Sequence, residues 1–96
     1  MVKNGKGKVY YDNGRIAFEG DYLNGKGKEY YENGRVKFEG EYLNEEKWKG
    51  KEYYDNGRVK YEGEYKNGEK WNGKNYKYYS DGKVSSIDEY LNGKIK

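Results

Sequence analysis

Tyr30-Tyr31-Glu32-Asn33-Gly34-Arg35 is the stretch of sequence that decides the fold, because related stretches return along the 96-residue chain. They occupy residues 10–15 and 53–58 and, in a looser form, residues 78–83. The glycines of the four stretches lie 20 to 25 residues apart, at Gly14, Gly34, Gly57 and Gly82. Self-similarity at such a period predicts an array of stacked supersecondary units, none of which buries a core alone.

Three of the four repeated stretches contain the Asn-Gly dipeptide. It occurs eight times from Asn4-Gly5 onward and is the strongest short signal for a β-hairpin. A two-residue type I′ turn at Asn33-Gly34 sets Glu32 opposite Arg35 and Lys28 opposite Glu39. The same register pairs opposite charges in the neighbouring units, and each such pair contributes roughly 0.2–1 kcal/mol. A three-residue turn with a bulge is expected to shift every pair and lose this agreement.

This register gives each hairpin a face that we expect to be packed. In the second unit it carries Tyr31, Val36, Phe38, Gly40 and Tyr42. The glycine leaves space for a neighbouring ring or backbone to approach closely. The opposite face is charged and also carries the first tyrosine of each repeated stretch. These tyrosines are Tyr10, Tyr30 and Tyr53, and the register sets them opposite Ala17, Lys37 and Lys60.

The composition favours a folded chain with rings in place of an aliphatic core. Charged residues make up 39% of the chain and hydrophobic residues only 32%, a balance that by itself is typical of disorder. Fourteen Tyr, two Trp and two Phe nevertheless supply large apolar area, and such rings pack well on a half-exposed sheet. The sequence therefore predicts an all-β domain built from hairpins.

We expect one domain, with hairpin units at about residues 5–24, 25–46, 47–69 and 70–96. The connections after the second and third units are longer and each contains a tryptophan, Trp48 or Trp71. The last unit is irregular. Ser86 and Glu89 fit a helix capping box, whereas alignment of residues 88–93 with residues 40–44 and their relatives favours a strand. Helix and strand both stay open for residues 86–92, and the strand is preferred.

The sequence lacks the residues of common catalytic and metal sites. His and Cys are absent, which removes Ser-His and Cys-His nucleophiles and the usual zinc ligands. Each regular carboxylate has a cationic neighbour in the predicted register, so no acid–base pair stands out. We therefore expect no enzyme activity, catalytic residue, cofactor or metal site.

The charge pattern and the lack of long apolar runs limit the partners. The net charge of +3 is spread along the chain, whereas nucleic-acid binding needs clustered and uncompensated cations. No segment is apolar enough to span a membrane, and the first residues do not resemble a signal peptide. We expect a soluble protein, cytoplasmic by default, that binds neither nucleic acid nor membranes.

Phe38-Glu39-Gly40-Glu41-Tyr42-Leu43-Asn44, followed by Gly50-Lys51-Glu52-Tyr53-Tyr54-Asp55-Asn56-Gly57, resembles the MORN repeat. It is most similar to the bacterial variant of this repeat found in antitoxin-like proteins, and the resemblance covers essentially the whole chain. The resemblance implies an elongated, single-layer, twisted array of antiparallel hairpins. It also implies a scaffold role in protein–protein association or, in some members, attachment at membranes.

Two classes of function are compatible with these residues. The first is a scaffold for a protein or peptide partner, because Tyr, Trp and Arg dominate interface energies. Its candidate contact residues are Tyr10, Tyr30, Tyr53, Arg15, Arg35, Arg58, Trp48 and Trp71. Alternatively, the two tryptophans simply pack between hairpins.

The second class is a purely structural fragment of a longer array. The half-unit at residues 3–8 and the ending at residues 93–96 favour an excerpt, and unpaired end strands could let copies join end to end. An antitoxin-like protein that binds a cognate toxin and a tether to membrane lipids are further alternatives.

Overall fold

The computed structural model describes residues 6–96, and all regular secondary structure in that range is β-strand. The strands are β1 (Lys6–Tyr10), β2 (Ile16–Asp21), β3 (Asn24–Tyr30), β4 (Val36–Leu43), β5 (Glu46–Tyr53), β6 (Val59–Lys66), β7 (Glu69–Tyr78), β8 (Val84–Leu91) and β9 (Lys94–Ile95). The Asn4-Gly5 turn, the start of the first unit at residue 5 and residues 3–5 of the predicted half-unit lie outside the described residues.

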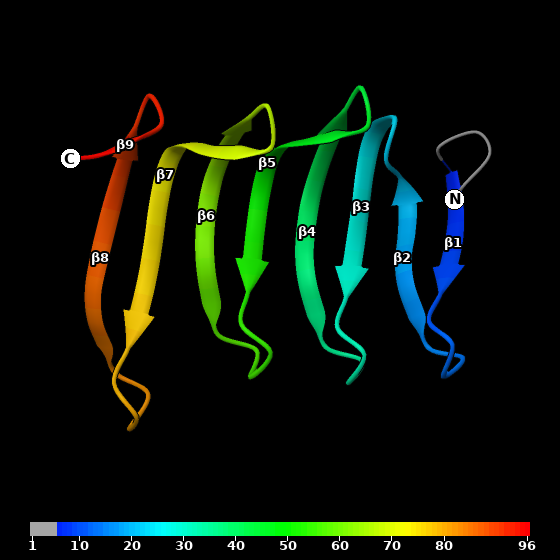
Figure 1. Ribbon diagram of the computed structural model, residues 1–96, viewed down its shortest axis with the longest axis horizontal. Coiled ribbons are helices and arrows are strands. Elements are labelled where there is room, and N and C mark those ends of the chain that lie inside the picture. The colour runs from blue at the N-terminus through cyan, green and yellow to red at the C-terminus, as the bar shows by residue number, and fades with distance from the viewer. Residues whose placement is uncertain (1–5) are drawn as a thin grey trace.

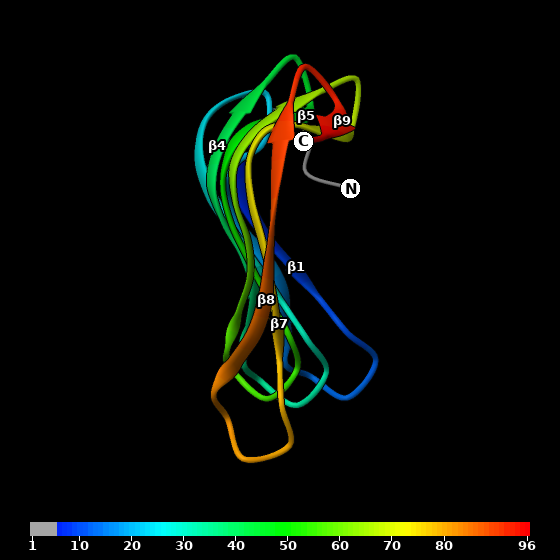
Figure 2. The same ribbon diagram turned by 90° about the vertical axis from the view of Figure 1, so that its left-hand side faces the viewer.

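The strands form one antiparallel sheet in which each strand lies beside its neighbours in the sequence (Figure 1). The molecule measures 39 × 31 × 15 Å along its principal axes, so the sheet is a single layer. Figure 2 shows this layer edge-on, with strands that curve and twist along their length. The predicted all-β repeat array is confirmed.

Residues 86–91 belong to strand β8, so the preferred strand is confirmed and the helical alternative is wrong. Lys74 pairs with Glu89 and Tyr76 pairs with Ile87, and these partners continue the ladder from β7. Asn92 and Gly93 form the turn into β9 instead of ending a helix.

The turns that join β1–β2, β3–β4, β5–β6 and β7–β8 differ from the predicted type I′ turn. The amide of Gly34 donates to the carbonyl of Tyr31 at 2.9 Å, and the amide of Tyr31 donates to the carbonyl of Arg35 at 2.8 Å. Gly34 has a φ of +91°. These contacts define a three-residue loop made of a type I turn and a left-handed glycine. The two-residue turn is wrong here, and Arg35 lies opposite Tyr31 instead of Glu32.

A β-bulge one step from each of these turns corrects the register. Tyr30 pairs with Val36 and Glu29 pairs with Phe38, which leaves Lys37 as an extra residue on β4. Lys28 therefore still lies opposite Glu39, as predicted. The expectation that a three-residue turn would shift every pair is wrong, because the bulge cancels the shift. The equivalent extra residues in the other hairpins are Ala17, Lys60 and Ser85.

Type I′ geometry occurs in turns at the opposite end of the strands. Asn67 and Gly68 have φ values of 54° and 79°, and Asn92 and Gly93 have values of 52° and 85°. Each of these pairs is a two-residue loop between paired strands. The Asn-Gly signal thus predicts the type I′ turn correctly at these two connections, whereas Asn24-Gly25 and Asn72-Gly73 lie within β3 and β7.

Glycines lie opposite one another along a row that crosses the sheet from β1 to β7. The row consists of Gly7, Gly20, Gly27, Gly40, Gly50, Gly63 and Gly73. A Cβ on Gly40 would lie 2.3 Å from the carbonyl oxygen of Lys49 and 2.9 Å from the ring of Phe38. As predicted, the glycine leaves space for close packing, and both a neighbouring backbone and a ring occupy that space.

The core lies on what we call the aromatic face, where rings cover the glycine row. Its buried residues are Phe38, Tyr42, Tyr61 and Tyr65, with Phe18, Tyr22 and Tyr90 packed against them. Neighbouring rings meet edge to face, as Phe38 and Tyr42 do with centroids 5.6 Å apart. Such pairs add about 0.5–1.5 kcal/mol to the area that they bury. The predicted packed face is confirmed for the rings of the first three units. It is wrong for Val36, because the bulge sets Val36 opposite Tyr30.

Gly40→Ala should destabilise the fold by about 1–3 kcal/mol or more, because the new methyl overlaps backbone that cannot move away. The measurement is the free energy of unfolding in urea. Gly68→Asn is the matched control, since a Cβ there meets nothing within 4 Å and Asn tolerates its φ of +79°. Equal stability of the Gly40→Ala variant and the native chain would contradict the close approach across the row.

Candidate functional site: the turn edge and the charged face

Arg15, Arg35 and Arg58 lie together at one end of the strands. We call this end of the sheet the turn edge; it carries the turns at residues 11–15, 31–35, 54–58 and 79–83. Each arginine reaches the turn of the next hairpin. The guanidinium of Arg15 donates to the carbonyl of Glu32 at 3.2 Å, and that of Arg58 lies over the ring of Tyr78 at 5.6 Å. All three side chains are exposed. The turn edge therefore presents a row of guanidinium groups: those of Arg15 and Arg58 contact the next hairpin, and that of Arg35 lies beside Gly57.

Tyr30 and Tyr53 lie on the face opposite the core, which we call the charged face, at the ends of β3 and β5. Their hydroxyls donate to the carboxylates of Glu19 and Glu39 at 2.5 Å. The hydrogen bond to Glu19 and partial burial raise the pKa of Tyr30 to about 12. Burial and the hydrogen bond to Glu39 raise the pKa of Tyr53 to about 12. Both hydroxyls are thus engaged within the array, whereas Tyr10, on β1, is 57% exposed.

The partners predicted for these tyrosines across the hairpin are wrong. Tyr10, Tyr30 and Tyr53 lie opposite Ile16, Val36 and Val59, because Ala17, Lys37 and Lys60 are the bulged residues. The ammonium groups of Lys37 and Lys60 lie 5.7 Å from the ring centroids of Tyr31 and Tyr54. The bulge therefore turns each lysine toward the second tyrosine of the repeated stretch.

Trp48 and Trp71 lie at the other ends of the strands, away from the turn edge. They belong to β5 and β7 and not to loops, and Trp48 is the extra residue of a bulge opposite β4. Lys49 covers the ring of Trp48 at 4.5 Å, and Lys66 covers that of Trp71 at 4.6 Å. A Cβ on Gly93 would lie 3.0 Å from the ring of Trp71. Trp71 therefore packs against the next connection, as the alternative interpretation expected.

The family model for the MORN repeat variant matches four segments, at residues 3–24, 23–44, 49–67 and 71–92. The chain belongs to the MORN repeat family. A search of curated proteins and a search of solved structures each gave no match. MORN repeats fit an interaction or structural role, and the sheet described above is the form that this array takes.

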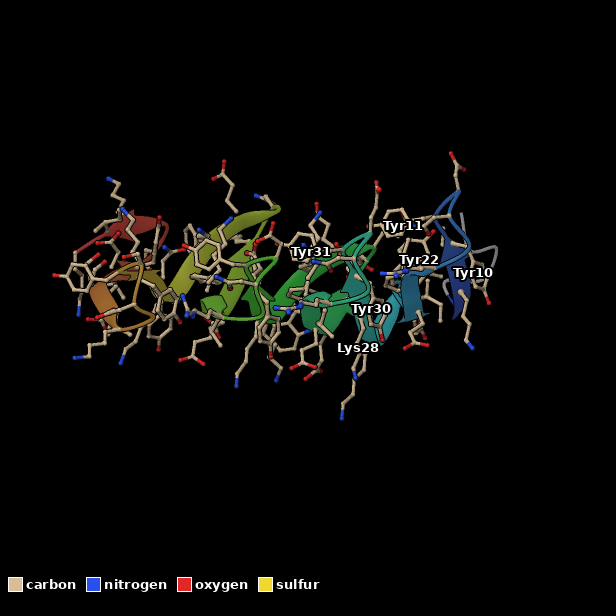
Figure 3. All side chains as sticks on the ribbon, turned by 90° about the horizontal axis from the view of Figure 1, so that it is seen from below. Tyr10, Tyr11, Tyr22, Lys28, Tyr30 and Tyr31 are labelled. Carbon is tan, nitrogen blue, oxygen red and sulfur yellow. The ribbon has the colours of Figure 1, made fainter. Side chains whose placement is uncertain are left out.

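Two rows of charge flank the glycine row on the charged face of this MORN array. In the longer row, Lys and Glu alternate from strand to strand, and it consists of Lys8, Glu19, Lys28, Glu39, Lys51, Glu62, Lys74 and Glu89. Figure 3 shows Lys28 extending from this face while Tyr11 lies on the other side. A groove of about 520 Å³ lies between the rows around Gly27 and Gly40. The predicted Lys–Glu pairs are confirmed, and the row spans adjacent repeats as well as hairpins. The predicted pairs of acid and arginine at the turns, such as Glu32 with Arg35, are wrong.

The aromatic face of the MORN array holds two lysines that the sequence did not single out. Lys47 lies 4.6 Å from the centroid of Phe38 and 3.5 Å from Glu29. Lys70 donates to the buried Asn75 at 2.7 Å, and burial lowers its pKa. Both lysines lie two residues after a turn between repeats. This shared position was the signal in the sequence that could have identified them.

No helix within residues 6–96 is long and apolar enough to cross a membrane. The same residues contain no group of three or more Asp or Glu side chains placed to hold a metal ion.

The MORN array should lose stability as the pH rises from about 10 to about 12. Tyr30, Tyr53 and Tyr76 have folded-state pKa values raised to about 12 from an ordinary value of 10.0. The folded state therefore keeps these protons more tightly, so the associated stability is complete below pH 10 and disappears as the tyrosines ionise. Circular dichroism and tyrosinate absorbance, followed together, should change in one cooperative step. Full tyrosinate formation near pH 10 in a chain that stays folded would contradict this.

Proposed function

We propose that this chain is a protein–protein interaction scaffold without catalytic activity, and that its turn edge contacts the partner. The observation that carries the proposal is the exposed row of Arg15, Arg35 and Arg58, each of which lies beside the following turn. Arginine is enriched among the residues that dominate interface energies. Guanidinium groups that are already held in place lose less conformational entropy on binding.

The repeat geometry supports a partner that follows the edge in an extended form. Successive arginines come from hairpins two strands apart, which corresponds to roughly 10 Å in a sheet. Tyr30 and Tyr53 lie beside this row, but their hydroxyls are engaged by Glu19 and Glu39, so they contribute ring surface. The tryptophans lie at the far end of the strands, and this proposal does not use them.

The test compares partners retained by the immobilised native chain with those retained by a variant carrying Arg15→Glu, Arg35→Glu and Arg58→Glu. We expect the triple variant to lose a partner that the native chain binds. A matched control carries Lys66→Glu, Lys94→Glu and Lys96→Glu, which make the same charge change at exposed positions away from the turn edge. It should keep that partner.

Circular dichroism establishes that both variants are folded. Light scattering of the native chain reports whether the chain binds only copies of itself. Equal retention by the two variants would overturn the turn-edge proposal. Self-association with no other retained partner would favour a structural role instead.

A further inference from the structure

The last two hairpins of the array meet at the turn edge around a hollow of about 600 Å³. It is lined by Tyr54, Asn56, Arg58, Lys77, Tyr78, Tyr79 and Ser80. A hollow of this volume lies in the range that binds small molecules or single side chains. Its position at the irregular fourth repeat distinguishes it from features that recur in every unit.

The lining of this hollow carries net positive charge. Arg58 and Lys77 are its cations, and its lining contains no carboxylate. The groove around Gly27 and Gly40, in contrast, is lined by three lysines and three glutamates. The hollow can therefore attract an anion that the charged face would not hold.

The positive charge results from two local changes in the fourth repeat. Ser80 stands where the other three turns carry Asp12, Glu32 and Asp55, so the acid is replaced by a hydroxyl. Strand β7 is ten residues long where β5 is eight, and this greater length includes Lys77. Lys77 pairs with Asp88 at 3.8 Å on the surface, and exposed pairs of this kind contribute little.

Fixed aromatic rings form the other part of the lining. The rings of Tyr54 and Tyr78 meet edge to face at 6.1 Å, and their hydroxyls donate to the carbonyls of Tyr76 and Val59. The guanidinium of Arg58 lies over the Tyr78 ring. Tyr79 is 60% exposed beside them. The hollow therefore joins a preformed cationic site to flat apolar surface.

We propose that this hollow binds a phosphate monoester carried on an aromatic ring, as in a phosphotyrosine side chain of a partner polypeptide. Arg58 and Lys77 bind the phosphoryl oxygens, the Ser80 hydroxyl donates to one of them, and the ligand ring lies against the tyrosines. Arginine suits this task because its fork of donors matches a phosphate. The proposal rests on the proposed function, since Arg58 belongs to the turn-edge row.

The test is a titration followed by NMR amide shifts of the native chain, with N-acetyl-phosphotyrosine amide as the probe. Shifts should concentrate at Tyr79 and Ser80. The affinity should exceed that for N-acetyl-tyrosine amide by about tenfold, the size expected when hydrogen bonds to a charged group are added. Inorganic phosphate, N-acetyl-phosphoserine amide and inositol trisphosphate test whether the ring is needed and whether a lipid headgroup is preferred.

Ser80→Asp is the decisive variant, because it restores the acid that two other turns carry as aspartate and so should fold. It should weaken phosphotyrosine binding by about tenfold, since a carboxylate then faces the phosphate. Asn67→Asp, which adds the same charge at an exposed turn on the opposite edge, should leave binding unchanged.

Equal binding of the unphosphorylated probe, stronger binding of inositol trisphosphate or phosphoserine amide, or an unaffected Ser80→Asp variant would each overturn the inference. These outcomes can be separated from failure of the proposed function. A partner that depends on the three arginines while the phosphotyrosine probe does not bind leaves the scaffold intact and removes only this site.

Discussion

The rings of the aromatic face rest directly on backbone that carries no side chains, and the rest of the sheet depends on this contact. Phe38 lies so close to Gly40 and Gly50 that a Cβ on either glycine would be within 3 Å of its ring. Phe38 and Tyr61 are thereby completely buried in a sheet that is only one layer thick. A flat ring can cover backbone in this way, which explains why the chain uses tyrosine where a layered protein would use leucine and valine.

The tyrosine hydroxyls connect this core to the charged residues around it. Tyr42 and Tyr65 donate to Glu29 and Glu52, which lie on the aromatic face. Tyr30, Tyr53 and Tyr76 donate to glutamates on the charged face. Within the described part of the chain, no buried side-chain polar atom lacks a hydrogen-bond partner. Each of these five tyrosines thus supplies apolar area and places its hydroxyl in a hydrogen bond to a residue of another strand.

The sequence was sufficient to predict the fold class, the rings of the packed face and the Lys–Glu pairs of the charge ladder, because each of these recurs with the repeat. It was not sufficient for the turns. Asn-Gly is compatible with a type I′ turn and with a type I turn that ends in a left-handed glycine, and both occur here on opposite edges. The bulge at Lys37 had no separate signal, because its effect on the register cancels that of the longer turn. The predicted two-residue turn therefore pairs Lys28 correctly with Glu39 but pairs Tyr30 with Lys37 instead of Val36.

The candidate site could be predicted in part, because some of its residues also recur with the repeat. Periodicity located Arg15, Arg35 and Arg58, and the sheet places them on one edge. It also included Trp48 and Trp71, which the sheet places at the other ends of the strands. The hollow at Arg58 depends on departures from the pattern, namely Ser80 in place of an acid and the greater length of β7. Residues that all repeats share follow from what every unit needs, whereas the hollow depends on residues that only the fourth repeat carries.

The alternating row of lysine and glutamate on the charged face has a consequence for how the chain finds its pairing. Strands with lysine in this row are β1, β3, β5 and β7, and those with glutamate are β2, β4, β6 and β8. Pairing two strands of the same group would place like charges opposite each other, which disfavours it. Exchange of one whole hairpin for another preserves the alternation and carries no such penalty. The row therefore disfavours mispairing by one strand during folding, but it does not disfavour mispairing by one complete repeat.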